Sequence, residues 1–162
     1  MRALIAVAIV GMVSIWVYVM YLSFGPGRAA PPDELDDPTF AIAAQDRCRE
    51  ALDAVGQLPR AADTPTAAER ADVIDEANGI FATMLDDLTA ITPTGEDGEL
   101  VTAWLTDWHT FLDDRESFAT ALRADSSARM LVSAKDGQHI TEYLDAFAGD
   151  NDMPACSTPI DV

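Results

Sequence analysis

The chain has 162 residues, which is enough for one compact domain and a short additional segment. It carries 28 acidic residues against 10 Lys and Arg, and a formal net charge of −18 repels nucleic-acid phosphates and anionic lipid head groups. No Asp or Glu precedes Asp33, so the acidic character belongs to the later part of the chain. We therefore expect no nucleic-acid partner.

The first predicted element is an apolar helix at the N-terminus. Residues 3–24 contain no charged side chain, and as a helix they would span roughly 33 Å, about the thickness of a bilayer core. Aromatic residues gather in the second half of the segment, as at a membrane interface: Trp16, Tyr18, Tyr21 and Phe24. We expect residues 1–24 to form an uncleaved signal-anchor that contacts the membrane through residues 3–24. A cleaved signal peptide with a weak site at residues 27–29, and a buried core helix, are the alternatives.

Residues 25–37, "GPGRAAPPDELDD", are rich in Gly, Pro and acidic residues and predict a linker. An acidic helical domain is expected over residues 38–162. Its first helix starts after Asp37, which can cap it, and ends before Pro59. A second helix starts at Thr66 and Glu69, which fit a capping box, and ends before Pro93.

Within that second helix, Asn78 and Gly79 could form a turn. The apolar residues keep their spacing of three and four across the pair, so we expect one continuous helix, with the glycine at a close helix–helix contact. A third helix is expected over residues 98–125 and a fourth over residues 137–150, whereas residues 126–137 fit either a kinked helix or an extended connector. No strand pattern is evident. The fold class is therefore all-α, an antiparallel bundle of about four helices after the transmembrane helix.

The chain has two cysteines, Cys48 on the inner face of the first bundle helix and Cys156 in the C-terminal tail. Because the first and last helices of such a bundle are neighbours, a Cys48–Cys156 disulfide could fasten the tail to the first helix. Two cysteines after an export-type segment are the number needed for one bridge. We expect this disulfide and, with it, an extracytoplasmic domain; two unrelated thiols in a reducing compartment are the alternative.

Arg115 is unusual because it lies on the apolar face of the third helix. Burying a guanidinium requires compensating partners, and three carboxylates lie within helical reach: Asp75, Asp86 and Asp145. We interpret Arg115 as a buried ion pair, or alternatively as an anion site. The neighbouring Trp104 and Trp108 are core residues or, in the alternative, the wall of a ligand pocket.

Catalytic signatures are not evident in the sequence. The two histidines, His109 and His139, have no Glu-x-x-His or zinc-protease context, and no phosphate loop or nucleophile elbow occurs. We therefore expect no enzyme, cofactor or specific metal site. The sequence favours a single-pass cell-membrane protein whose extracytoplasmic helical domain contacts an unknown envelope protein or has a structural role. The alternative is a small-ligand or ion-binding domain with a pocket near Arg115 and the Trp104/Trp108 stripe.

Overall fold

A computed structural model describes residues 2–24 and 31–159, and in the first stretch it describes the side chains of residues 9–22. The chain divides into two compact units, Met1–Pro32 and Asp33–Val162. The first unit contains one helix, α1 (Arg2–Phe24). Part of the predicted linker, residues 25–30, lies outside the described residues, whereas Asp33 to Asp37 belong to the second unit.

The structure overturns the predicted transmembrane helix. Among the residues it describes, none of the helices has both the length and the apolar character needed to cross a membrane. The fold class predicted from the sequence is wrong in this respect, and the single-pass and signal-anchor assignments that depended on it lose their basis.

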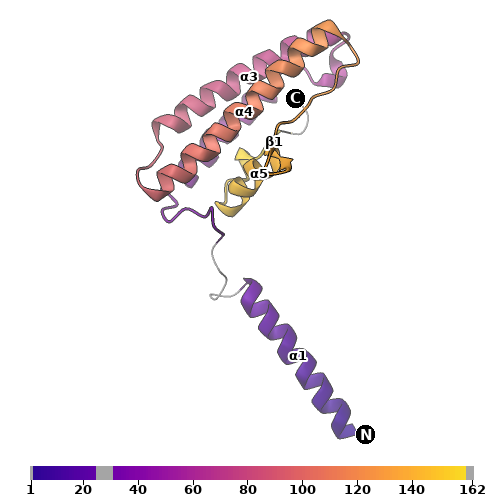
Figure 1. Cartoon of the computed structure of the whole chain (residues 1–162), viewed down its shortest axis with the longest axis vertical. Helices are drawn as coiled ribbons and strands as arrows, with labels where there is room; N and C mark the ends of the chain where they lie inside the picture. The colour runs from indigo at the N-terminus through magenta and orange to yellow at the C-terminus, as the bar shows by residue number, and fades with distance from the viewer. Residues whose placement is uncertain (1, 25–30, 160–162) are drawn as a thin grey trace. The chain divides into compact units, whose positions relative to one another are not determined.

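The second unit is a helical bundle, as predicted. It consists of α2 (Thr39–Val55), α3 (Ala67–Ala90), α4 (Glu96–Ala124) and α5 (Ile140–Asp150), with short 3-10 turns η1 (Ala61–Asp63) and η2 (Pro154–Cys156). The long helices α3 and α4 lie side by side and antiparallel (Figure 1), while α2 packs on α3 and α5 packs on α4. The turn η2 contacts both α2 and α5, so the end of the chain closes the bundle.

Thr66 caps α3 as predicted, whereas α2 begins at Thr39 with Pro38 at its N-cap and no side-chain cap bond, and the predicted capping residue Asp37 lies one position earlier. The Asp37 carboxylate accepts hydrogen bonds from the backbone N–H and the hydroxyl of Thr39, at 2.9 and 2.6 Å, and these bonds lower the pKa of Asp37. At α3 the Glu69 N–H donates to Thr66 Oγ1, and the Thr66 hydroxyl donates to the Glu69 carboxylate. The helix α3 is continuous through Gly79, as expected. The expectation of a close contact at Gly79 is wrong, because a Cβ atom there would meet nothing within 4 Å.

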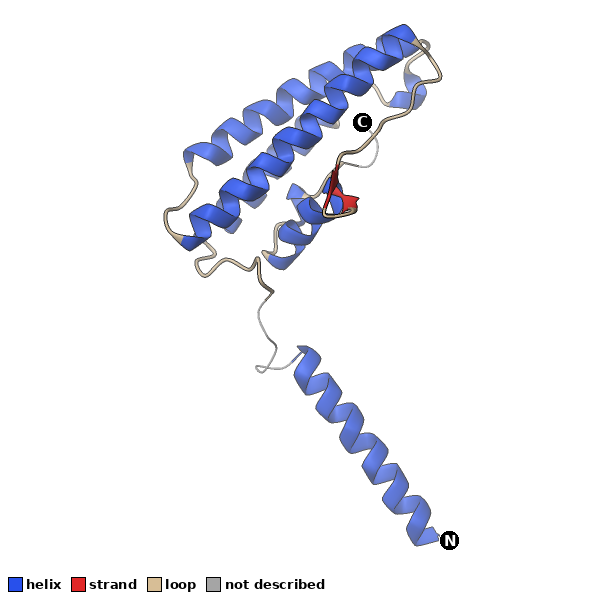
Figure 2. Ribbon diagram, in the orientation of Figure 1, coloured by secondary structure: helices blue, strands red, loops and turns tan. Residues whose placement is uncertain are grey.

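An extended segment with a small hairpin joins α4 to α5. The strands β1 (Ala134–Lys135) and β2 (Gln138–His139) pair antiparallel, and they are drawn in red in Figure 2. Asp136 and Gly137 between them have φ values of 49° and 85°, the positive-φ pair of a tight hairpin turn. Sequence analysis did not predict these strands, because two residues are too few to show an alternating pattern.

Aromatic side chains connect all four helices of the bundle. The ring of Trp104 on α4 lies 6.4 Å from Phe40 of α2 and 5.1 Å from Phe147 of α5. Trp108, one turn further along α4, lies 6.0 Å from Phe81 of α3 and 6.4 Å from Trp104. Since all these side chains are buried, the two tryptophans form the centre of the core.

Candidate functional site

The C-terminal tail is covalently attached to α2. A disulfide joins Cys48 and Cys156, with Cα atoms 5.1 Å apart and a sequence separation of 108, and both cysteines are buried. Next to it, the Ala155 N–H donates to Gln45 Oε1 of α2 at 2.9 Å. Beyond it, the backbone N–H of Thr158 donates to the Asp145 carboxylate of α5 at 2.7 Å. The disulfide predicted from the sequence is confirmed, and hydrogen bonds on both sides hold the tail in place.

A buried amide joins the beginning of the second unit to its end. Asn151, directly after α5, accepts the Leu35 N–H on Oδ1 at 2.8 Å. Its Nδ2 donates to the carbonyl oxygens of Asp33 and Phe147, both at 2.9 Å. All three described hydrogen bonds of the amide are made with backbone groups, so Asn151 fixes the path of residues 33–35. No sequence motif indicated this role.

Arg115 is buried in the core beside α3, with 2% of its surface exposed. Its Nε donates to Asn78 Oδ1 of α3 at 2.6 Å, and its guanidinium lies over the rings of Phe81 and Phe111, at 5.6 and 5.8 Å. Burial lowers the pKa of Arg115 from its ordinary value to about 10, because desolvation disfavours the charged form. The structure therefore places Arg115 at the α3–α4 contact, with an amide and two rings around it.

The carboxylates predicted as partners of Arg115 have other described contacts. Asp75 lies 2.7 Å from Arg123, which also pairs with Asp72, and Asp145 binds Thr158. Asp86 is exposed. The ion pair or anion site at Arg115 stays a prediction.

The cavities near Arg115 and near the tryptophans are separate. One of about 340 Å³ between α3 and α4 is lined by Asn78, Asp113 and Arg123 but by neither tryptophan. Another, of about 90 Å³, is lined by Trp104, Tyr143 and Phe147 but not by Arg115. Trp108 borders neither of them and is surrounded by rings instead.

The smaller cavity contains a charge cluster that sequence analysis missed. Lys135 Nζ lies 2.6 Å from Asp107 Oδ2 and 5.1 Å from the centre of the Tyr143 ring. Only 14% of the Asp107 side chain is exposed, compared with 39% for Lys135. The available signal was that Lys135 is the only lysine of the chain. Its partner could not be inferred, because the hairpin that carries Lys135 was not predicted.

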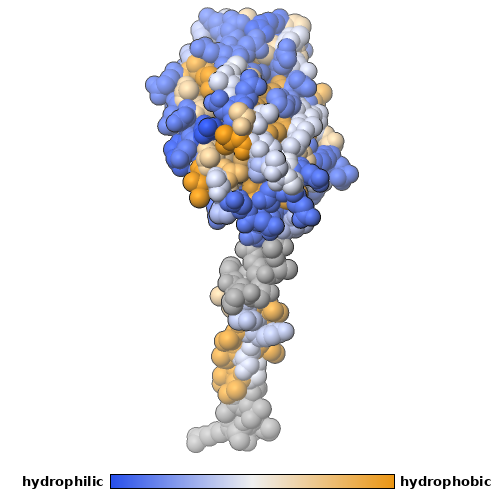
Figure 3. Space-filling view, turned by 90° about the vertical axis from the view of Figure 1, so that its left-hand side faces the viewer, coloured by the Kyte–Doolittle hydropathy of each residue, from blue (hydrophilic) through white to orange (hydrophobic). Residues whose placement is uncertain are grey.

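The two histidines are exposed: His109 on the outer face of α4, and His139 at the start of α5. Over the described parts of the chain, His, Cys, Asp and Glu form no group of three or more that could hold a metal ion. Figure 3 shows one face of the second unit, on which hydrophilic residues predominate and hydrophobic ones form small patches. Among the residues of this unit that the structure describes, two large apolar side chains are nevertheless strongly exposed, Ile42 at 66% and Leu131 at 83%.

Comparisons with protein-family models, with curated proteins and with solved structures found no match to this chain.

Proposed function

We propose that the second unit is an interaction module that binds an envelope protein in an oxidising, extracytoplasmic compartment. The observation that carries this proposal is the buried Cys48–Cys156 disulfide. Disulfides form and persist in compartments outside the reducing cytosol. A bridge that fastens the C-terminal tail to α2 stabilises the folded state of the domain, which suits a small exported domain.

The charge of the unit indicates the partner's chemistry. With a net charge of −18 on the whole chain, a protein with a basic surface is favoured, because complementary potentials accelerate association and select partners. Protein interfaces also need apolar contacts at their centre. The exposed Ile42 on α2 and Leu131 before β1 are two apolar side chains available for such contacts.

The compartment is tested by the redox state of the cysteines in growing cells. Acid quenching followed by thiol alkylation, with and without prior reduction, would report whether Cys48 and Cys156 are bonded. We expect modification only after reduction. Free thiols in rapidly quenched cells, together with modification that requires lysis, would contradict the extracytoplasmic assignment.

Protein contact is tested by photo-crosslinking from the full chain. A photoreactive amino acid at position 42 or 131 is expected to give a discrete crosslinked product that weakens with added salt. The same residue at position 50, the site of exposed Glu50 on α2, is the matched control. Products that are equally strong from all three positions, or absent at 42 and 131, would contradict the proposal.

The second candidate, a ligand-binding domain with one pocket near Arg115 and both tryptophans, has less support. Trp108 lies within the ring cluster of the core, and of the expected lining residues the two cavities described above contain only Trp104, in the smaller one. The cavity beside Trp104 supports a narrower inference of its own.

A further inference from the structure

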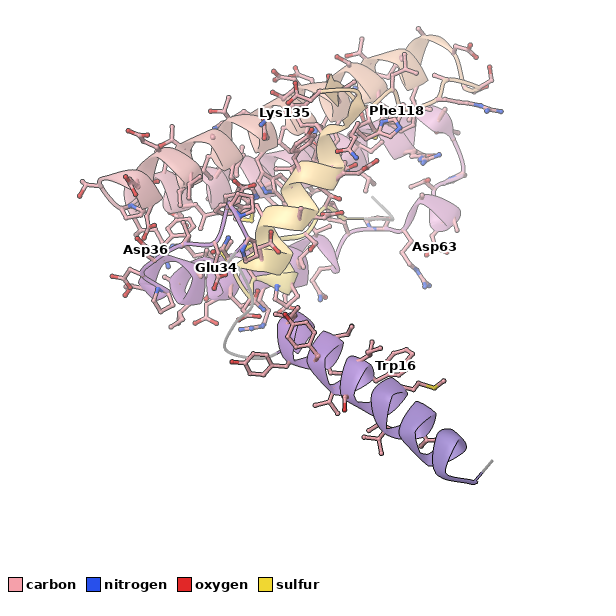
Figure 4. The ribbon with its side chains drawn as sticks, turned by 60° about the horizontal axis from the view of Figure 1, so that its bottom comes forward. Trp16, Glu34, Asp36, Asp63, Phe118 and Lys135 are labelled. Carbon is pink, nitrogen blue, oxygen red and sulfur yellow. A yellow bond between two sulfur atoms is a disulfide. The ribbon has the colours of Figure 1, made fainter. Side chains whose placement is uncertain are left out.

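We propose that the cavity beside Lys135 is a binding site for a small alkylammonium ion, and that the Lys135 side chain occupies this site in the structure. The proposal does not depend on the interaction function above. It rests on the lining of the cavity, the charge within it and the way Lys135 is carried. Lys135 is labelled in Figure 4, where it lies alongside α4.

The cavity combines aromatic faces with carboxylates. Trp104 and Phe147, whose rings are stacked at 5.1 Å, line it together with Tyr143 and two acidic residues, Asp33 and Asp107. Aromatic faces attract cations through the ring quadrupole, and cages of such rings recognise substituted ammonium groups. The lining consists mainly of aromatic rings, apolar side chains and carboxylates rather than of hydroxyl and amide groups. Its chemistry therefore favours an organic cation over an anion.

The Lys135 ammonium shows which group fits there. It makes a 2.6 Å contact with the largely buried Asp107 and lies 5.1 Å from the Tyr143 ring centre. The site thus gives a cation both of the contacts that ammonium recognition requires, a carboxylate and an aromatic face. An external alkylammonium ion would take the place of Lys135 beside the same carboxylate and ring. A quaternary ion has no N–H and would meet Asp107 through its charge and methyl groups, without the hydrogen bond that Lys135 makes.

The volume limits the size of the ligand. The free volume beside Lys135, which forms part of the cavity wall, is about 90 Å³, several times the roughly 10–15 Å³ that one water molecule needs by this measure. It is well below the roughly 300 Å³ at which sites for drug-sized ligands begin. A compact ion such as tetramethylammonium, or the head of choline, is therefore the appropriate class.

The position of Lys135 permits exchange. Lys135 is the last residue of the two-residue strand β1, directly before the Asp136–Gly137 turn, and its side chain is 39% exposed. Rotation of this side chain toward solvent would free Asp107 and Tyr143 without opening the helical core. The internal ammonium competes for the site. The apparent affinity for an external ion is therefore the intrinsic affinity multiplied by the fraction of molecules in which Lys135 does not occupy the site.

The test is titration of the full chain with tetramethylammonium and with choline, by calorimetry and by the Trp104 indole N–H resonance. That N–H donates to the Leu144 carbonyl oxygen at 3.3 Å and reports on the cavity wall. Lys135→Met keeps an apolar stem and removes the competing charge. We expect it to tighten the apparent Kd at least about tenfold, as for a site that Lys135 occupies about nine-tenths of the time.

Three controls distinguish binding of a cation in this cavity from effects of net charge or of apolar contact. Arg60→Met removes one positive charge from an exposed residue outside the cavity and should bind as the unaltered chain does. The neutral isostere of choline, 3,3-dimethylbutan-1-ol, should not bind. Adding Asp107→Asn to Lys135→Met should abolish binding. If that double variant does not fold, Lys135→Met with Tyr143→Leu takes its place and should weaken binding at least about fivefold, the loss of one cation–π contact.

Equal affinity of the Lys135→Met and Arg60→Met variants would overturn the proposal, because the effect would then be one of net charge. Binding of the neutral isostere as tight as that of choline would overturn it as well. Neither result would affect the crosslinking or redox tests of the interaction function, since those depend on other residues.

Discussion

Asn151 holds Leu35 by a hydrogen bond from the Leu35 N–H to the Asn151 amide oxygen, at 2.8 Å and across 116 positions of the sequence. The same amide donates to the carbonyl oxygens of Asp33 and Phe147.

Removing a buried amide leaves its backbone partners without a bond, which costs about 1–3 kcal/mol. We expect Asn151→Ala to lower the free energy of unfolding by this amount in urea titrations. Gln138→Ala, at an exposed amide, should change it by less than about 0.5 kcal/mol, and equal effects would contradict the role of Asn151.

Two helical glycines should respond oppositely to alanine. At Gly98 a Cβ atom would lie 2.2 Å from the Pro93 carbonyl oxygen, so backbone must move, and we expect Gly98→Ala to destabilise by about 1–3 kcal/mol. At Gly79 the added Cβ meets nothing within 4 Å, and alanine should stabilise the exposed middle of α3 by about 0.5–1 kcal/mol. Thermal and urea unfolding of both variants would measure this. A loss of stability in Gly79→Ala would show that the glycine has a packing role.

Replacing both cysteines by alanine should destabilise the second unit. The bridge closes a loop of about 100 residues, and loss of such a crosslink typically costs about 2–5 kcal/mol. The double variant Cys48→Ala/Cys156→Ala should unfold at a lower urea concentration, and reductant should move the unaltered protein in the same direction. Reductant should have no effect on the double variant. Unchanged unfolding in both experiments would contradict a stabilising role.

Arg115→Ala should lower the free energy of unfolding by about 2–4 kcal/mol, because it empties a buried site and removes contacts with Asn78 and two rings. Arg49→Ala, at an exposed pair with Asp46, should cost about 0.5 kcal/mol or less. An Arg115→Ala variant with unchanged stability would contradict a structural role.

The pKa of Arg115 also predicts a pH dependence. Burial lowers this pKa to about 10, well below the ordinary value of a guanidinium, so the unfolded chain binds the proton more tightly. Stability therefore rises as the pH increases above about 10, and below that pH the cost of the buried charge is fully present. The stability difference between the unaltered chain and Arg115→Ala should accordingly be flat from pH 5 to 8. A slope in this range would assign a different titrating group to the site.

Local patterns in the sequence were enough to predict the bundle and its bridge. The three-four spacing of apolar residues identified α2 to α5, and the neighbouring first and last helices made a Cys48–Cys156 bond geometrically reasonable. Thr66 and Glu69 indicated the start of α3 because capping depends on residues three positions apart. These features are either local or follow from helix order.

Features that depend on distant residues were not predictable. The partners of Asn151 lie up to 118 positions away, and the Lys135–Asp107 pair requires the path of the chain between α4 and α5. The predicted membrane anchor was also wrong, because among the described residues no helix is both long enough and apolar enough to span a membrane. Arg115 is buried, as its place on the apolar face of the helix predicted, but its described Nε partner is an amide that periodicity does not select.

The disulfide determines how the second unit would respond to tension. When force is applied at its two ends, the bond between Cys48 and Cys156 carries the load, and the residues between them are shielded from extension. Only the flanking segments can lengthen, beginning with residues 33–35, which Asn151 holds by hydrogen bonds alone. An oxidised unit would therefore extend by a short, fixed length before resisting further pulling, whereas a reduced one would unravel through α3 and α4.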